Sequence, residues 1–360
     1  MLRHVHPELW RNDFDGDVYL GDRPVDDALI IDIAVELSRF AGVSFRRTLV
    51  QEAITYVAGR HHRHPLADWL RSLTWDGVER LDRLLPDYLG TRDDALHRQL
   101  GLMWAVGAVS RPLDPGGKLD NTLVLIGDQG TGKSTAVATL AMRPEWFNDT
   151  PADLRSKDAR LALRGTWLME LAGLDSLKRS ELSAMKAFLT DAVDRFRPPY
   201  GRHDVRYKRS TVFVGTSNEQ DILRDPTGDR RFWPVETTII DLAALKRDRE
   251  PLWAEAVERY QDGCQFWPTP AFETTLTRHR QQFQVGDAWL APLATLLDDA
   301  PDEFTTYDAI VYGVGLSVAH TNSRSAEMRV SALLRKLGCR RGPRRGSGTK
   351  RIRTWTKPSV

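Results

Sequence analysis

Over the first 90 residues, the apolar positions recur at the spacing expected of helices. This spacing is present in residues 25–40 and 48–58, and again in residues 81–89 after an interruption at residues 76–78. We therefore expect residues 1–91 to form a mainly helical accessory or collar domain.

The pattern changes beyond residue 91. An acidic first turn followed by a strongly apolar run predicts a buried helix over residues 92–110. The apolar runs that follow are short, as in central strands, and helix patterns separate them. The expected strands are residues 121–127, 167–171 and 211–215, and the expected helices between them are residues 133–142 and 177–189. This alternation predicts an α/β fold with a parallel sheet, in a domain of residues 92–266.

Polar residues follow each expected strand. In open parallel sheets, ligands bind at the carboxyl ends of the strands, so we expect these polar clusters to meet in space. Residues 242–260 then return to a helical pattern, and a connector containing Pro and Trp follows at residues 266–270.

The last part of the chain, residues 285–360, is predicted to be a separate domain. It contains three short helix patterns and then a glycine-rich hairpin pattern, at residues 291–297, 305–313, 326–337 and 344–355. This order predicts a winged-helix-like domain.

The composition indicates a globular protein. Hydrophobic residues make up 41% and charged residues 28%, which excludes a fibrous or largely disordered chain. The two cysteines, Cys264 and Cys339, exclude a disulfide scaffold and lack the spacing of a zinc or redox pair. The first residues lack the apolar stretch of a signal peptide, and no apolar run is long enough to span a membrane. We expect a cytoplasmic protein with no membrane partner.

The formal net charge of +2 conceals an uneven distribution. Residues 324–357 contain twelve Lys or Arg residues and one acid, Glu327. A segment of this charge density is typical of nucleic-acid binding. Within it, we expect Arg344, Arg345, Lys350, Arg351 and Arg353 to contact DNA.

A phosphate loop is the strongest motif in the sequence. The pattern G-x-x-x-x-G-K-[ST] follows the first expected strand and opens a helix, as Gly127-Asp128-Gln129-Gly130-Thr131-Gly132-Lys133-Ser134. Glycines allow the backbone N–H groups to face phosphate oxygens, Lys133 reaches the β and γ phosphates, and Ser134 binds magnesium. We also assign Thr135 to this nucleotide site. The alternative, a plain glycine-rich turn, is disfavoured because a lysine at a helix start opposes the helix dipole unless an anion is bound.

A phosphate loop needs a nearby acid to hold Mg²⁺ and to orient water. The second expected strand ends at Glu170, and Asp175 follows five residues later. We assign the Mg²⁺ and water role to Glu170 and keep Asp175 as the alternative. Either residue could instead be a surface carboxylate.

Two further motifs fit the terminal phosphate of ATP. Asn218 ends the third expected strand, where an amide can contact the attacking water or the γ phosphate, although Asn after a strand is often only a turn former. Arg230 and Arg231 lie on a tight turn next to aromatic residues. They could stabilise the transition state at a neighbouring subunit's nucleotide. The alternative is local pairing with Asp225 and Asp229.

A segment before the third strand mixes cations with aromatic residues, a combination that binds single-stranded nucleic acid. We interpret residues 200–208 as a hairpin with Arg202 and His203 at its tip. The alternative is a solvated basic loop. The DNA-contacting residues expected in this region are Lys186, Arg195, Arg197, Tyr200, Arg202 and His203.

Several motifs in this order resemble the virulence-associated protein E family, which comprises phage and mobile-element ATPases related to superfamily 3 helicases and to the primase-helicases of viruses and plasmids. The motifs are residues 75–82, the phosphate loop, residues 186–189 with 194–201, and residues 225–234. The resemblance covers roughly residues 70–265.

The resemblance implies an AAA+-type ATPase core, a hexameric ring and a role in replicating the element's DNA. It implies Lys133 and Ser134 for ATP and Mg²⁺, Glu170 as the acidic motif, Asn218 as sensor and Arg230-Arg231 as an arginine finger. The chain departs from the family at Gly173, where a second glutamate is usual. This departure leaves open which carboxylate activates water.

Our main hypothesis is therefore a ring-shaped, DNA-stimulated ATPase and helicase that uses ATP and Mg²⁺. Fewer than about 95 residues precede the expected ATPase domain, too few for a primase, so we expect any priming partner to be encoded separately. A second hypothesis is a regulatory or defence NTPase that binds DNA without unwinding it. A third, a small-molecule kinase, leaves the paired arginines and the basic tail without a role.

Overall fold

The computed structural model describes residues 2–149, 156–174, 179–197, 204–219, 222–223, 229–284, 289–315, 324–345 and 352–358. The chain divides into two compact units, Met1–Gln284 and Val285–Val360. The further division predicted near residue 91 stays a prediction. In the part of the chain that is described, no helix has both the length and the apolar character needed to cross a membrane.

The first unit begins with helices and a small sheet. Its elements are α1(Leu2–Val5), β1(Leu9–Asn12), β2(Val18–Leu20), β3(Arg23–Pro24), α2(Asp27–Ala41), α3(Arg47–Ala58), β4(His62–Arg63) and α4(Pro65–Ser72). The expected helices are present as α2 and α3, and Asp26 caps α2 by accepting a hydrogen bond from the Leu29 N–H. The four strands, in the order β3-β2-β1-β4, were not predicted. They are two to four residues long, too short for an alternating pattern to appear.

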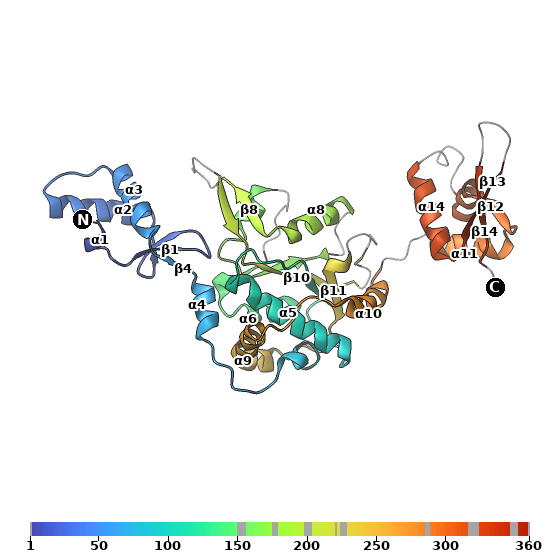
Figure 1. The fold of residues 1–360 in the computed structure, drawn as a ribbon, viewed down its shortest axis with the longest axis horizontal. Coiled ribbons are helices and arrows are strands. Elements are labelled where there is room, and N and C mark those ends of the chain that lie inside the picture. The colour runs from blue at the N-terminus through green and yellow to red at the C-terminus, as the bar shows by residue number, and fades with distance from the viewer. Residues whose placement is uncertain are drawn as a thin grey trace. The chain divides into compact units, whose positions relative to one another are not determined.

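A five-stranded parallel sheet forms the centre of this unit (Figure 1). The remaining helices and strands of the first unit are η1(Leu81–Arg83), η2(Leu84–Tyr88), α5(Ala95–Leu113), β5(Thr122–Ile126), α6(Lys133–Leu140), η3(Pro144–Trp146), β6(Phe147–Asn148), α7(Lys157–Leu161), β7(Leu168–Ala172), α8(Arg179–Thr190), β8(Val193–Phe196), β9(Val205–Lys208), β10(Val212–Ser217), η5(Asp229–Arg231), β11(Phe232–Glu236), α9(Leu242–Gln261) and α10(Pro270–Gln281). The strand order is β11-β5-β10-β7-β6, and every neighbouring pair is parallel. The predicted parallel α/β architecture is confirmed, with β6 and β11 added to the expected strands.

Helices cover both faces of this sheet (Figure 1). Leu123 and Leu125 of β5 pack with α5, α6 and α9, whereas Val124 and Ile126 pack with α7 and α8. Successive side chains of a strand point to opposite faces, so a strand covered on both faces is apolar throughout. This explains why β5 is buried over its whole length.

An antiparallel hairpin, β8 and β9, projects between α8 and β10. Its first strand begins at Val193, earlier than the predicted start at residue 200. The charged residues of β8 concealed this strand in the sequence. Asp194 is fully buried because it pairs with Arg209, whose nitrogens lie 2.6 and 2.9 Å from its carboxylate oxygens.

The second unit packs helices on a three-stranded sheet. Its elements are α11(Leu290–Asp299), β12(Glu303–Thr305), α12(Thr306–Asp308), η6(Ala309–Val314), α14(Arg324–Lys336), β13(Arg340–Arg345) and β14(Ile352–Thr356). The sheet order is β12-β14-β13. Leu293, Phe304, Val330 and Trp355 form part of a common core. The expected helices and hairpin therefore occur in the predicted order, with β12 added to the sheet.

Candidate functional site

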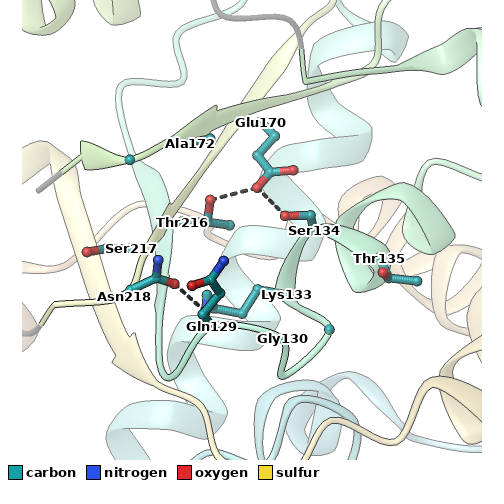
Figure 2. A pocket seen from close by; sticks show the side chains of 12 residues that line it. Gln129, Gly130, Lys133, Ser134, Thr135, Glu170, Ala172, Thr216, Ser217 and Asn218 are labelled. Atoms are coloured by element: carbon teal, nitrogen blue, oxygen red, sulfur yellow. Dashed lines mark hydrogen bonds between the residues drawn. The ribbon is translucent and has the colours of Figure 1, made fainter. Parts of the chain in front are cut away.

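The loop between β5 and α6 borders a cavity of about 360 Å³ at the carboxyl end of the central sheet. Gly132 is the N-cap of α6 and has a φ of 92°, a left-handed conformation that favours glycine. The first N–H groups of α6 have no intrahelical partner, and the helix dipole is positive at this end. The cavity is lined by Gln129, Gly130, Gly132, Lys133, Ser134, Thr135, Glu170, Ala172, Gly173, Thr216, Ser217 and Asn218 (Figure 2).

Lys133 is buried in the loop. Its Nζ donates hydrogen bonds to the carbonyl oxygens of Gly127 at 2.7 Å and Asp128 at 2.8 Å. A third bond runs to the amide oxygen of Asn218 at 3.1 Å (Figure 2). Burial lowers the pKa of the Lys133 ammonium below its usual value. An anion bound beside the loop would offset this loss of hydration.

Glu170 is the carboxylate of the cavity and is 4% exposed. Ser134 and Thr216 both donate to its Oε1, at 2.7 and 2.6 Å (Figure 2). Its Oε2 is buried and has no hydrogen-bond partner among the described residues. A buried carboxylate oxygen without a partner is costly, which makes this atom a candidate ligand for a cation.

Thr216 is a site residue that the sequence analysis did not identify. It lies on β10, where Val214 pairs in register with Glu170 of β7. Because side chains of a strand alternate, Thr216 is on the same face of the sheet as Val214, two residues further toward the carboxyl end. Its position in the sequence, two residues before Asn218 near the end of a buried strand, is the signal that could have identified Thr216 as a site residue.

The strand order brings Asn218 to the phosphate loop. β10 lies between β5 and β7, so the residues after β10 are close both to the loop after β5 and to Glu170 on β7. The bond between Asn218 and Lys133 is the direct result. The phosphate-loop residues, Glu170 and Asn218 are thus brought together as their positions after three strands predicted.

Arg230 and Arg231 lie at the other end of the sheet. They directly precede β11, whose Phe232 pairs with Thr122, while its Glu236 pairs with Ile126 next to the phosphate loop. Four residues of strand span roughly 13 Å, so the arginines lie at the amino end of the sheet, away from the cavity. Arg230 is exposed, and the Nε of Arg231 has no hydrogen-bond partner among the described residues.

Lys186, which was predicted to contact DNA, is buried in an ion pair in the structure. Lys186 is 7% exposed and its Nζ lies 2.9 Å from Asp229 Oδ1. The helix pattern of α8 did not reveal which of its polar positions faces the turn at Asp229. Lys186 therefore holds the turn that carries Arg230 and Arg231.

The hairpin presents cations on one face. Arg195 and Arg206 are exposed and directly opposite each other, and exposed Lys208 lies on the same face as Arg206. Arg197, exposed just beyond β8, was also predicted to contact DNA. Asp204 lies 3.1 Å from Arg195 and offsets its charge, but Arg206 and Lys208 leave this face with an excess of positive charge, which suits a polyanion. Arg206 and Lys208 were missed, although they alternate along β9 as exposed residues of a strand do.

Several predicted residues lie outside the described parts of the chain. These are Asp175, Tyr200, Arg202, His203, Lys350 and Arg351. Arg344 and Arg345 are on β13 and Arg353 is on β14, with Arg344 paired to Arg353 in the backbone register.

The oxygen atoms of Ser134, Thr216 and Glu170 fit a magnesium ion. Mg²⁺ prefers oxygen ligands and usually takes one or two carboxylates together with phosphate and water. Glu170 Oε2 is a buried oxygen of this cavity that has no hydrogen-bond partner among the described residues. No cluster of three or more His, Cys, Asp or Glu suited to a metal occurs among the described residues. Ser134, Thr216 and Glu170 therefore offer oxygen atoms of the kind that Mg²⁺ takes as ligands.

Comparisons with known proteins identify relatives of the sequence and of the fold. The sequence model of the virulence-associated protein E-like domain matches residues 70–285. The apo structure of the NrS-1 C-terminal region (305–718) is similar in fold, with a TM-score of 0.52 at 12% identity, over 97% of this chain and 95% of that chain. An A-form apo structure of the same region has the same TM-score and identity, over 98% of this chain and 96% of that chain. No curated protein matches the sequence.

Proposed function

Because the chain belongs to the virulence-associated protein E-like family, we propose that it is an ATP-hydrolysing DNA helicase or translocase that acts in the replication of a phage or mobile genetic element. The observation that carries this proposal is the single cavity that unites Lys133, Ser134, Glu170 and Asn218 at a phosphate loop. The family resemblance adds an AAA+-type core and a hexameric ring.

The residues that line the cavity support the proposed ATP binding and hydrolysis. The phosphates lie on the loop, where Lys133 exchanges its bonds to the loop carbonyls for phosphate oxygens. Ser134 and Glu170 would hold Mg²⁺, which would neutralise charge on the phosphates. Water attacks the γ phosphorus, the bond to the β–γ bridging oxygen breaks, and ADP, phosphate and a proton are released. Asn218, at the end of β10, is positioned to contact the attacking water.

The position of the paired arginines supports an oligomer. Arg230 and Arg231 lie at the opposite end of the sheet from the cavity of their own chain. An arginine that neutralises the transferring phosphoryl group can come from another subunit. We assign Arg230 and Arg231 to the nucleotide of a neighbouring copy, so that each active site contains residues of two subunits.

Two basic surfaces support DNA binding. The hairpin exposes Arg195, Arg206 and Lys208. In the second unit, the helices and hairpin have the order of a winged helix, and exposed cations lie on α14 and β13. We assign this unit to DNA as a winged-helix-like domain, with the phosphate backbone as its main target.

The test is ATP hydrolysis by the Lys133→Ala variant. Loss of a charged donor at the phosphates is expected to lower kcat by about 100-fold or more. Lys118→Ala is the matched control, because Lys118 is 85% exposed and outside the cavity lining. Full hydrolysis by Lys133→Ala would overturn the proposed site. Strand displacement on a forked duplex then separates a helicase from an NTPase that binds DNA without unwinding it.

A further inference from the structure

The segment after β11 runs alongside the phosphate loop. A Cβ on Gly127 would lie 2.7 Å from the carbonyl oxygen of Thr237, and one on Gly132 would lie 3.4 Å from Leu242. Thr237 also donates its backbone N–H to the carbonyl oxygen of Ile126, at 2.6 Å. Residues 237–242 therefore border the loop from its first residue to the start of α6.

This segment is held in place by the chain that precedes α5. Thr238 donates to the carbonyl oxygen of Gly90 through its backbone N–H at 3.1 Å and through its hydroxyl at 2.7 Å. Asp241 donates its N–H to the Tyr88 carbonyl oxygen at 3.0 Å. The backbone around Ile239 is thus fixed from both sides.

Ile239 is apolar and almost fully exposed. Its exposed fraction is 85%, the highest of any large hydrophobic side chain in the described residues. A fixed backbone that presents isoleucine to solvent beside a phosphate loop forgoes the stability that burial of this side chain would give. A ligand that covers Ile239 would recover it.

A second cavity, of about 310 Å³, lies next to this segment. It is lined by Gly90, Thr91, Arg92, His97, Glu236, Thr238, His279, Gln282 and Phe283. The His279 ring packs edge-on against the rings of His97 and Phe283, with distances of 5.4 and 5.1 Å between the ring centroids. Pockets of this size with aromatic walls and a few polar groups are typical of small-molecule sites.

His279 contributes an uncharged wall to this cavity. Its Nε2 lies 2.7 Å from the Pro234 carbonyl oxygen, which can only accept, so Nε2 carries the hydrogen. Burial lowers the pKa of His279 below its usual value, which favours the neutral ring. The charged lining residues Arg92 and Glu236 have opposite signs, so they and the neutral His279 ring add no net positive charge that would favour phosphate over a base.

The two cavities lie on opposite sides of the loop. The first extends toward β10 and β7, where Glu170 and Asn218 are placed for the terminal phosphate. The second lies at the end of β11, on the other side of β5. We propose that the base and ribose of the bound nucleotide cover Ile239 and enter the second cavity while the phosphates lie on the loop. This inference rests on the proposed nucleotide site and adds to it the part that holds the base and ribose.

The experiment compares ATP with inorganic tripolyphosphate, each with Mg²⁺, by isothermal titration calorimetry on the full-length chain. In Ile239→Ala we expect the Kd for ATP to rise about tenfold, because most of the covered side chain is removed. The Kd for tripolyphosphate should stay within about twofold, since it has no base. Val78→Ala is the control, because Val78 is also an exposed aliphatic residue, at 52%, outside both cavity linings. Ile239 is exposed, so the substitution leaves the core intact.

The other outcomes separate this inference from the proposed function. Equal weakening of both ligands, or of neither, would overturn the placement of the base. If the wild-type chain binds tripolyphosphate as tightly as ATP, the base makes no contact and the second cavity is not its site, while the loop assignment stands. Binding of neither ligand by the wild-type chain would overturn the nucleotide site itself.

Discussion

At the carboxyl end of the central sheet, polar side chains enclose a cavity, whereas at the amino end of the same strands they form ion pairs or face solvent. The cavity contains one lysine and one carboxylate among its described lining residues, Lys133 and Glu170. At the amino end, Arg209 is fully buried against Asp194, and Arg230 is exposed. Arg209 and Arg230 therefore lie at the end of the sheet away from this cavity.

The difference shows that burial and partner decide the role of a cation more than its position in the sequence does. Arg209 and Lys186 are buried with Asp194 and Asp229, and they hold the hairpin and the arginine turn in place. Arg230 projects from that turn. We infer that the amino end of the sheet is a structural support that presents Arg230 and Arg231 to another copy of the chain.

The largest effect is expected from breaking the buried pair at the amino end. Asp194→Ala leaves Arg209 buried without its carboxylate, which should lower the free energy of unfolding by about 3–5 kcal/mol. Asp204→Ala removes the partner of Arg195 in an exposed pair, and its cost should be at most about 1 kcal/mol. Urea unfolding of both variants measures the difference. Equal losses would show that the amino end is not a buried support.

At the carboxyl end, Glu170→Gln should abolish most hydrolysis while the chain stays folded. The amide keeps the shape but not the charge that Ser134 and Thr216 contact, so we expect kcat to fall by about 100-fold. Glu219→Gln is the control, because Glu219 is an exposed carboxylate just after β10. Steady-state ATPase rates measure both variants. A normal rate in Glu170→Gln would assign the acid role to another residue.

A smaller effect is expected from Thr216, which positions Glu170. Thr216→Val removes one donor to the charged carboxylate and should lower kcat about tenfold. The variant should also require more Mg²⁺ for half-maximal activity, a change that a purely structural role would not produce. Thr216→Ser should restore both values. If Thr216→Ser behaves like Thr216→Val, the hydroxyl has no positioning role.

The smallest effect concerns DNA binding by the second unit. Lys336 and Arg340 are exposed cations at the end of α14 and the start of β13. Replacing both by Gln should reduce the slope of log K against log salt by about 2 for duplex DNA. Arg39→Gln in combination with Lys118→Gln removes the same charge from the first unit and should leave the slope unchanged. An unchanged slope in the Lys336 and Arg340 variant would mean that these residues do not contact phosphate.

The sequence was sufficient to predict the centre of the fold and much of the site. β5, β7 and β10 are buried strands followed by polar residues, so their ends could be placed together before the structure was known. The phosphate loop, Glu170 and Asn218 line one cavity for this reason. The strand order, which places β10 beside β5, depends on tertiary packing and has no local sequence signal.

Other features arise only from contacts between distant residues. The sequence shows Asp194 in a basic, aromatic segment, and nothing local indicates that Arg209 will bury it. Lys186 likewise resembles an exposed helix residue until Asp229 is placed beside it. Thr237 lies close to Gly127, although the two residues are 110 positions apart in the sequence. This contact places Ile239 and the second cavity beside the phosphate loop.

We propose that each active site combines the phosphate loop of one copy with Arg230 and Arg231 of another. The most direct test mixes Lys133→Ala with the Arg230→Ala, Arg231→Ala double variant and measures ATP hydrolysis. Each variant alone should be about 100-fold or more below wild type. Mixing equal amounts should restore activity, because about one interface in four then joins an intact loop to intact arginines. No recovery, from variants shown to assemble together, would contradict the account.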